Sequence, residues 1–465
     1  MTPARRPNPV DHSPTLNRSM KMLGNMLITV SVITPASSIF IIAPGVVQQA
    51  GTGAFLAFAF AALVCICTAF VYAELSSAYP LAGGEYAIIG RVLGPFPGFI
   101  ALGLNFVTLV LMVSVIALGI GNYTEALFGD AYKQMVAVGS IVVTTLLSIL
   151  NIRTNAVITG VFLAIEIVAL IILTWLGFDH VSRSLTSVIL HPVALVGDHL
   201  GPASAGMIGL AMSVAIFAYN GYGSAVYFGE ETHDAPKHVA RAILWSLVIG
   251  VIAEAIPITA VLLGAPDLQS MFASSNMLSD FITTRGGQTL NTVISLGIAL
   301  AILNANIASI LLVARLLFSS GRDHVWNKGL NRAFSRVHKR FHSPWVATLA
   351  CGVLSSLACF IDINLLLVIT GTSLVVIYAS LCVAALMGRR KGMTAKKQLY
   401  RMPLYPLPPL LALGMLGYVI YANYLDEAIG RPSLIATIGL ILLSAGYYSL
   451  ILRRKGKWVL RGPEE

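Results

Sequence analysis

Two apolar stretches of the sequence are interrupted by residues that a continuous helix tolerates poorly. The first holds Thr34-Pro35-Ala36-Ser37-Ser38, and the second holds Tyr219-Asn220-Gly221-Tyr222-Gly223. Proline removes a helical hydrogen bond, and serine hydroxyls compete for others. Free N–H groups at such a break bind a carboxylate well, whereas free carbonyls bind an ammonium group or a metal cation. A zwitterionic amino acid or an amine would satisfy both kinds of group.

The predicted substrate site is built from these two breaks. The backbone of residues 36–38 would hold a carboxylate, the carbonyls of residues 217–220 would hold an amine, and Tyr219 and Tyr222 would form a lid or wall. Each break alone also fits an ordinary Pro or Gly kink. The complete set of candidates is Thr34, Ala36, Ser37, Ser38, Ile39, Asn105, Phe217, Ala218, Tyr219, Asn220, Gly221, Tyr222 and Asn304.

Two acidic residues, Glu166 and Glu254, lie in the middle of other apolar stretches. An ionised acid at the centre of a bilayer costs about 2.5–3.5 kcal/mol, so such a residue is a functional candidate by default. Desolvation favours the neutral carboxyl, which could carry a proton, while a nearby cation would favour the ionised form. We predict coupling roles for Glu166 and Ser309. The alternative is a protonated carboxyl that is hydrogen-bonded to a neighbouring helix and serves only in packing. This alternative is stronger for Glu254. For Asn304 and Ser309 the alternative role is a hydrogen bond to a neighbouring helix.

A group of charged residues is expected at the inner ends of the apolar stretches. It contains Glu230, Glu231, Arg91, Lys237 and Arg315. Either these residues form an ion-pair gate that opens towards the inside, or they are a solvated loop end.

The composition explains why the elements that position these residues must be membrane helices. Of 465 residues, 57% are hydrophobic and only 11% are charged, and the mean hydropathy is +0.82, which excludes a soluble protein. Since a helix needs about 20 apolar residues to cross a bilayer, the sequence predicts an all-α polytopic membrane protein with 12 transmembrane helices. They cover roughly 22–48, 54–79, 95–122, 135–152, 155–177, 204–230, 240–264, 288–314, 344–361, 364–387, 405–425 and 433–452.

The placement of positive charge predicts the orientation. Of the 30 Lys and Arg residues, all but Lys133, Arg183, Arg285 and Arg431 fall on one side if both termini are cytoplasmic. We therefore expect a multi-pass protein of the cytoplasmic (inner) membrane, in contact with the lipid bilayer and not with nucleic acid. Its predicted parts are a cytoplasmic tail (1–21), a first repeat (22–177), an outer loop (178–203), a second repeat (204–387), a basic loop (388–404), two further helices (405–452) and a second cytoplasmic tail (453–465).

Four short motifs, in order along the chain, resemble those of the amino acid-polyamine-organocation (APC) superfamily of permeases. They are Ala36-Ser37-Ser38-Ile39-Phe40; Glu74 with Tyr79-Pro80, Gly83-Gly84 and Tyr86; Phe217-x-Tyr219 with Gly221-Tyr222 and Glu230-Glu231; and Ala314-Arg315 with Gly321-Arg322-Asp323. The resemblance implies a five-plus-five inverted repeat with helices 1 and 6 broken, followed by two helices that often support dimer contacts, so a homodimer is one expected assembly.

The resemblance also bears on coupling and on the substrate. At about the place of Glu166 these permeases carry a lysine that stands in for a sodium ion. A glutamate reverses the charge, and it could carry the coupling proton or help to bind sodium or a cationic substrate. The usual Gly-Ser-Gly of the first break is Ala36-Ser37-Ser38 here, which is bulkier and would narrow the pocket. Ala240 and His324 replace a usual proline and glycine.

The sequence therefore predicts a secondary active transporter for an amino acid or related amine, with proton-coupled uptake as the first expectation. The alternatives are an exchanger of amino acids or polyamines, and a transporter-like sensor without flux. No cofactor or metal is expected beyond H⁺, or Na⁺, as the coupling ion. The sequence holds no Walker, His-Glu-x-x-His or Gly-x-Ser-x-Gly motif, so we do not expect ATP-driven transport. The apolar stretches show no nucleophile with a paired base and no metal triad, so we predict no enzymatic activity.

Overall fold

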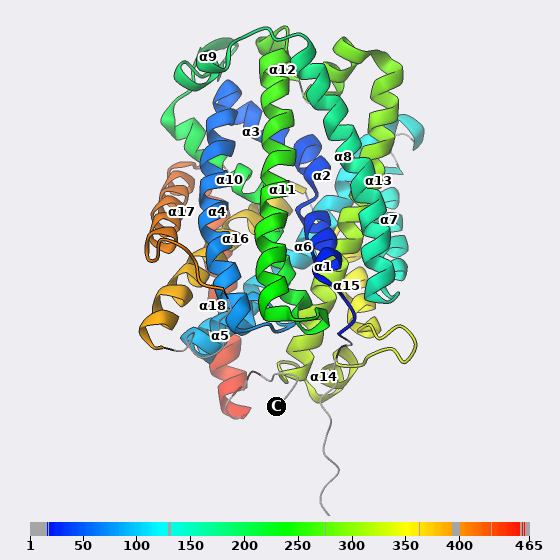
Figure 1. Cartoon of the computed structure of the whole chain (residues 1–465), viewed down its shortest axis with the longest axis vertical. Helices are drawn as coiled ribbons and strands as arrows, with labels where there is room; N and C mark the ends of the chain where they lie inside the picture. The colour runs from blue at the N-terminus through cyan, green and yellow to red at the C-terminus, as the bar shows by residue number, and fades with distance from the viewer. Residues whose placement is uncertain are drawn as a thin grey trace, which may run out of the picture.

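The computed structural model describes residue 16, residues 18–128, 132–274, 276–361, 363–392, 400–428 and 430–455, and residues 458 and 460. Most of the predicted N-terminal tail, and parts of the predicted basic loop and C-terminal tail, lie outside these residues. The helices run mainly along the long axis of the molecule (Figure 1). We call the end that carries α9 and α12 the upper end, and the end that carries α5 and α14 the lower end.

The first half of the described chain is almost entirely helical. Its elements are α1 (Met22–Ile33), α2 (Pro35–Ser37), a π-helical turn (Ser38–Ile42), α3 (Ala43–Ala50), α4 (Ala54–Ala78), α5 (Glu85–Leu93), α6 (Pro95–Phe128), α7 (Lys133–Ser148), α8 (Ile152–Asp179), α9 (Leu185–Leu190), β1 (Val193–Val196), β2 (His199–Pro202) and α10 (Ala205–Ala218).

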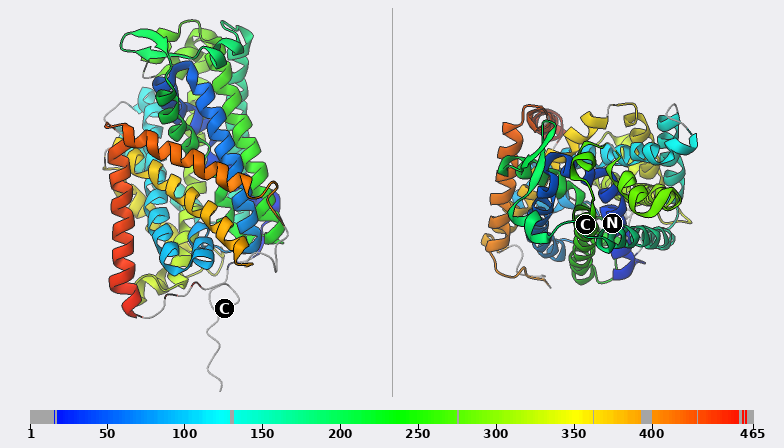
Figure 2. Two further views of the ribbon diagram at one scale, coloured as in Figure 1. Left: turned by 90° about the vertical axis from the view of Figure 1, so that its left-hand side faces the viewer. Right: turned by 90° about the horizontal axis from the view of Figure 1, so that it is seen from above.

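The second half continues with a 3₁₀ helix that follows the second predicted break. Its elements are that 3₁₀ helix (Tyr222–Glu231), α11 (Ala235–Gly264), α12 (Leu268–Ala273), α13 (Met277–Arg322), α14 (Lys328–Phe334), α15 (Trp345–Ala358), α16 (Ile363–Arg390), α17 (Leu407–Leu425), α18 (Gly430–Tyr447) and a π-helical turn (Tyr448–Leu452). Seen from the side, α17 crosses the bundle obliquely, while α18 runs along its edge (Figure 2).

Among the described residues, nine helical segments are long and apolar enough to cross a membrane. One of them, Met22–Ala78, covers two of the predicted crossings, and two further apolar helices, Lys133–Ser148 and Trp345–Ala358, are shorter. The twelve predicted ranges all fall on helical segments, but the number of crossings and the repeat arrangement remain predictions. The predicted range 204–230 is not one continuous helix, because α10 ends at Ala218 and a 3₁₀ helix follows.

The predicted outer loop holds structure that the sequence analysis did not anticipate. The helix α9 and the antiparallel pair β1–β2 lie at the upper end, with Val193 opposite Pro202. Gly51, with φ +56°, lies beneath this hairpin, and a Cβ at Gly51 would come within 2.0 Å of the Val193 carbonyl oxygen. Only glycine allows the link between α3 and α4 to approach the hairpin so closely.

At the lower end, Trp458 fixes the C-terminal segment to the helices. Its side chain is 8% exposed, stacks on Tyr86 at a centroid distance of 6.3 Å, and meets the edge of Phe99 at 5.5 Å. Its Nε1 donates to the carbonyl oxygen of Asp323 at 3.0 Å. This one side chain therefore joins the C-terminal segment to α5, α6 and the end of α13.

We expect Trp458→Ala to lower the free energy of unfolding by about 3 kcal/mol, because it removes a buried aromatic side chain and a hydrogen bond. Thermal unfolding of the purified protein in detergent would measure the loss. Trp245→Ala is a matched control, since Trp245 is 55% exposed and should change stability by less than about 0.5 kcal/mol. Equal shifts for both variants would contradict the role given to Trp458.

Candidate functional site

The first predicted break is present between α1 and α2. Thr34 has φ 54° and ψ 61°, a left-handed conformation that ends α1. Pro35 then begins the three-residue helix α2, and a π-helical turn starts at Ser38. Proline has no N–H to continue the hydrogen-bond ladder, which favours the end of α1 at this point, and the chain resumes as α3.

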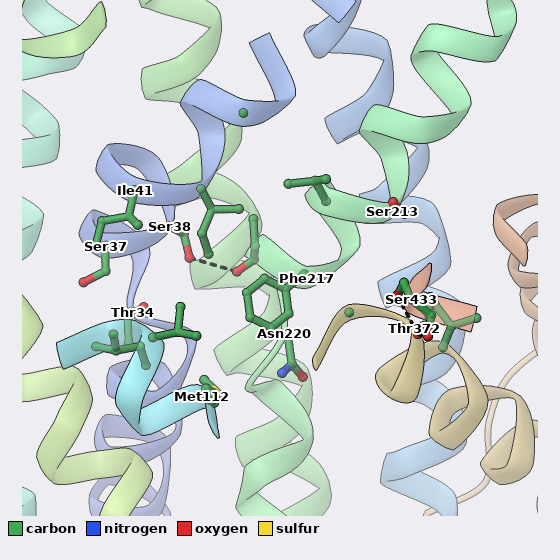
Figure 3. Close-up of a pocket in the computed structure, with 18 of the residues that line it drawn as sticks. Thr34, Ser37, Ser38, Ile41, Met112, Ser213, Phe217, Asn220, Thr372 and Ser433 are labelled. Atoms are coloured by element: carbon green, nitrogen blue, oxygen red, sulfur yellow. Dashed lines mark hydrogen bonds between the residues drawn. The ribbon is translucent and has the colours of Figure 1, made fainter. Parts of the chain in front are cut away.

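The second break lies beside the first. The helix α10 ends at Ala218, and Gly221 takes φ +121° before the 3₁₀ helix begins. A Cβ at Gly221 would lie 2.6 Å from the backbone nitrogen of Ile33, so glycine allows the two breaks to touch. The hydroxyl of Ser38 joins them further, since it donates to the carbonyl oxygen of Ala218 at 2.9 Å and to that of Ile33 at 3.1 Å (Figure 3).

A cavity of about 410 Å³ opens at this junction. The hydroxyls of Ser37 and Ser38 border one side, and Thr372 and Ser433 border the other (Figure 3). Its other lining residues are mostly apolar, and no Asp, Glu, Lys, Arg or His among the described residues lines it. The remaining lining residues are Ile33, Thr34, Ile41, Ile42, Gly45, Gln49, Met112, Val115, Ile116, Ser213, Val214, Phe217, Ala218, Asn220, Ile363, Gly371, Val375 and Asn423.

The structure brings six of the predicted substrate residues to the cavity wall. They are Thr34, Ser37, Ser38, Phe217, Ala218 and Asn220. The other seven are not on the wall: Ala36, Ile39, Asn105, Tyr219, Gly221, Tyr222 and Asn304. The sequence analysis missed several wall residues on α6, α16, α17 and α18, among them Met112, Val375, Asn423 and Ser433, because their side chains face the cavity only in the folded bundle.

Below the cavity, three tyrosines separate it from the lower end. The Tyr378 hydroxyl donates to Oδ1 of Asn220 at 3.0 Å. The rings of Tyr72, Tyr222 and Tyr378 contact one another at centroid distances of 5.8 to 6.0 Å. All three rings are buried, so they close the lower side of the cavity.

The predicted candidate Asn105 lies beyond these tyrosines, next to the buried Glu85. The Tyr72 hydroxyl donates to Oε1 of Glu85 at 3.0 Å, and Nδ2 of Asn105 lies 3.5 Å from Oε2. Glu85 begins α5 at the lower end, and burial raises the pKa of its carboxyl above the ordinary value. Asn105 therefore belongs to the lower closure and not to the cavity wall.

Glu166 is completely buried between α8, α13 and the first break. Its Oε1 accepts a hydrogen bond from Nδ2 of Asn304 at 2.7 Å, and Asn304 also reaches the hydroxyl of Ser31 at 3.1 Å. Its other carboxyl oxygen, Oε2, is buried and has no hydrogen-bond partner in the part of the chain that the structure describes. Ser309, the second predicted coupling residue, is buried, and its hydroxyl has no hydrogen-bond partner among the described residues.

Two buried ion pairs lie at the lower end, and both use acids of the predicted gate. Nε of Arg315 lies 2.7 Å from Glu231, and Nη2 of Arg322 lies 2.7 Å from Glu230. Arg322 was not among the predicted gate residues. Of the other predicted members, Arg91 donates to the carbonyl oxygen of Leu460 at 3.3 Å, and Lys237 is exposed.

A third ion pair joins α4 to α16. Glu74 accepts from Nε of Arg389 at 2.6 Å and from the backbone N–H of Met402 at 2.7 Å. Within the part of the chain that the structure describes, no group of three or more His, Cys, Asp or Glu side chains could hold a metal ion.

Comparison with known proteins identifies the family. A family model described as amino acid permease matches residues 22–444. The chain is 29% identical to an uncharacterized transporter of Mycobacterium tuberculosis, over 97% of this chain and 96% of that protein. It is 24% identical to the methylthioribose transporter of Bacillus subtilis, over 88% and 89% of the two chains. It is 26% identical to the branched-chain amino acid permease BcaP of Lactococcus lactis, over 91% and 92%.

The residues matched by the family model include both breaks, the cavity and the lower ion pairs. The long apolar helices are those expected of a membrane transporter. This chain is a multi-pass membrane transporter that belongs to the amino acid permease family, within the APC superfamily.

Proposed function

We propose that this transporter carries a neutral amino acid with an apolar side chain into the cell, together with a proton, by alternating access around the two broken helices. The observation that carries the proposal is the cavity at the junction of the breaks, which has an apolar wall and no charged side chain among the described residues. Main-chain dipoles at the two breaks supply the opposite charges that a zwitterion needs.

The backbone of residues 36–38 binds the carboxylate, and the carbonyls of residues 217–220 bind the ammonium group. Ser38 and Ala218 lie on the cavity wall and are hydrogen-bonded to each other, so both breaks are within reach of one small ligand. Phe217 and Asn220 lie on the same wall, above the tyrosines that close the lower side.

The apolar wall favours a neutral side chain over a second ammonium group. A diamine or polyamine would bury a positive charge against residues such as Met112, Ile116 and Val375, with no acid on the wall to pair with it. The names of two relatives, a branched-chain amino acid permease and a methylthioribose transporter, point to uncharged or zwitterionic substrates as well.

The proposed topology has twelve crossings in a five-plus-five inverted repeat, with both termini and the lower end in the cytoplasm. The two breaks, one after α1 and one after α10, support the repeat. The basic residues at the lower end support the orientation, because positive charge favours the cytoplasmic side. The membrane is then the cytoplasmic (inner) membrane, and the last two helices are the expected contact of a homodimer.

Uptake into proteoliposomes with an alkaline interior tests the proposal. Labelled pools of neutral amino acids, polyamines and methylthioribose are offered separately. We expect only the neutral amino acid pool to accumulate, and a protonophore to abolish the accumulation. Accumulation under a sodium gradient alone would replace the proton by Na⁺. Label exchange without net accumulation would make the protein an exchanger, and binding without flux would make it a sensor.

Narrowing the cavity should change which neutral amino acids are carried. Val375→Phe adds a ring to the wall, so uptake of leucine or isoleucine should fall by about tenfold or more, with a smaller loss for alanine. Val353→Phe is the matched control, since Val353 is 60% exposed and lies away from the cavity. Equal losses for leucine and alanine would place the substrate elsewhere.

A further inference from the structure

The lower ends of α1, α8 and α11 lie side by side and carry a cluster of exposed cations. The helix α1 packs against both α8 and α11, and the three lower ends are neighbours on the face of the molecule that Figure 1 shows. The cations belong to the segment before α1 and to the first two turns of α8 and α11. We call them the basic cluster: Arg18, Lys21, Arg153, Lys237 and Arg241.

Hydrogen bonds hold the parts of the basic cluster together. Nε of Arg153 donates to the carbonyl oxygen of Ser19 at 2.8 Å, so the start of α8 contacts the segment that precedes α1. The N–H of Met20 donates to the carbonyl oxygen of Glu231 at 2.9 Å, and the N–H of His233 donates to the carbonyl oxygen of Met20 at 2.9 Å. The segment before α1 therefore lies between the start of α8 and the chain that enters α11.

Acidic side chains do not neutralise the basic cluster. None of its five cations forms an ion pair with a carboxylate among the described residues. Glu166 and Glu254 are buried far along α8 and α11 at 0% exposure, and Glu231 is paired with Arg315. The exposed acid at these lower ends is Asp234, just before α11. The three helix N-termini add partial positive charge, so this surface is strongly cationic.

An exposed apolar face continues upward from the basic cluster. On α11, the exposed side chains of Trp245 and Val248 follow Arg241 at helical spacing. On α8, the exposed side chain of Val157 follows Arg153 one turn along the helix. In a membrane protein such side chains contact hydrocarbon, and tryptophan is typical of the boundary between headgroups and hydrocarbon. The cations therefore lie where the headgroups of a bilayer begin, and the apolar face lies where its acyl chains run.

We propose that the basic cluster binds the anionic headgroup of a phospholipid whose acyl chains lie along the apolar face of α8 and α11. Charge complementarity selects an anionic lipid over a zwitterionic one such as phosphatidylcholine. A soluble phosphate would match the cations but would leave the apolar face uncovered. The lipid lies in the cytoplasmic leaflet in the proposed orientation, and its binding does not rest on the proposed substrate.

Binding of this lipid stabilises the closed lower end. Nδ2 of Asn25 on α1 donates to the carbonyl oxygen of Ala225 at 3.3 Å and to the hydroxyl of Thr232 at 3.1 Å. These bonds tie α1 to the 3₁₀ helix, whose Glu231 forms a buried ion pair with Arg315. A headgroup that contacts both α8 and α11 therefore holds α1, which packs against both, in the closed arrangement.

Titration of the detergent-solubilised protein with phospholipids, followed by native mass spectrometry, tests the site without any substrate. We expect the wild type to bind phosphatidylglycerol much more tightly than phosphatidylcholine. Lys237→Gln/Arg241→Gln should weaken the binding of phosphatidylglycerol by about 25-fold, because each cation near a membrane surface contributes about fivefold. Both side chains are exposed and have no ion pair in the described structure, so this variant should fold.

Arg332→Gln/Arg336→Gln is the matched control. It removes the same charge from exposed residues in and just after α14, at the lower end but outside the basic cluster, so its affinity for phosphatidylglycerol should equal that of the wild type. Equal losses in the two double variants, or equal binding of the two phospholipids by the wild type, would overturn the proposal. Equally tight binding of glycerol phosphate would make this a site for a soluble phosphate and would overturn it as well.

Hydrogen exchange then tests the effect on the lower end. Phosphatidylglycerol should slow amide exchange in α1 and in the 3₁₀ helix of the wild type, and should have no such effect in Lys237→Gln/Arg241→Gln. Unchanged exchange in the wild type would overturn the stabilising role of the lipid. Neither experiment uses a transported compound, so a failure of the proposed function leaves both results interpretable.

Discussion

Glu166→Gln should lower the accumulation of substrate by about tenfold for each unit of an imposed pH gradient, while exchange of labelled for unlabelled substrate continues. Each coupled proton contributes a factor of ten per pH unit, and glutamine cannot release a proton. Proteoliposome uptake with an alkaline interior, beside a counterflow assay at equal pH, measures the two activities. Counterflow matters because it needs alternating access but no proton gradient.

The physical reason lies in the contacts of the carboxyl. Glu166 accepts from Asn304 at 2.7 Å, and Asn304 also donates to Ser31 at 3.1 Å, close to the first break where the substrate carboxylate is proposed to bind. An ionised Glu166 repels the incoming carboxylate. A protonated Glu166 does not, so proton and substrate should bind together. Glutamine is neutral and keeps the acceptor for Asn304, so it imitates the protonated form.

Glu427→Gln is the control for a change of charge alone. Glu427 is exposed and pairs with Arg431 one turn further along the chain, so its replacement should leave accumulation unchanged. Full proton-driven accumulation in Glu166→Gln would remove Glu166 from the coupling path. A loss of sodium-driven instead of proton-driven accumulation would make Glu166 a ligand of Na⁺.

The two breaks could be predicted from the sequence because proline and glycine act on the backbone locally. Pro35 lacks the N–H that would continue the hydrogen bonds of α1, and Gly221 is the residue that tolerates φ +121° where the breaks touch. The cavity wall could not be predicted in the same way. Thr372 and Ser433 meet there only because α16 and α18 lie side by side, which no local pattern specifies.

Two features missed at first had a signal in the sequence. Arg315 and Arg322 are seven residues apart, so they lie on one face of a helix, and they follow two adjacent acids, Glu230 and Glu231, that could receive them. The hairpin at the upper end was signalled by Gly197-Asp198 between two short runs. Arg91 and Lys237 were predicted as gate residues only because they are expected at the same inner face as Glu230 and Glu231.

Arg315→Gln should be the most destabilising single change at the lower end, with a loss of about 3–5 kcal/mol in the free energy of unfolding. The side chains of Arg315 and Glu231 are 1% and 2% exposed, and both Nε and Nη2 bond to the carboxylate, at 2.7 and 3.0 Å. Removing the arginine leaves Glu231 as a buried charge without its partner, and that uncompensated charge causes most of the loss.

The double variant Glu231→Gln/Arg315→Gln should recover much of that stability, because no charge then remains buried. Thermal unfolding of the wild type, both single variants and the double variant gives the coupling energy directly. Arg431→Gln is the matched control, since its exposed pair with Glu427 should contribute less than about 1 kcal/mol. Additive losses in the double variant would show that the two side chains do not act as a pair.

The wild type, the two single variants and the double variant also test whether this ion pair acts as a gate. The pair joins the 3₁₀ helix after the second break to α13, so the lower end can open only if Glu231 and Arg315 separate. A folded double variant should therefore open at this end more readily than the wild type, and its substrate affinity should fall as the closed cavity becomes less populated. If the double variant instead binds substrate as tightly as the wild type, the pair stabilises the fold without controlling access to the cavity.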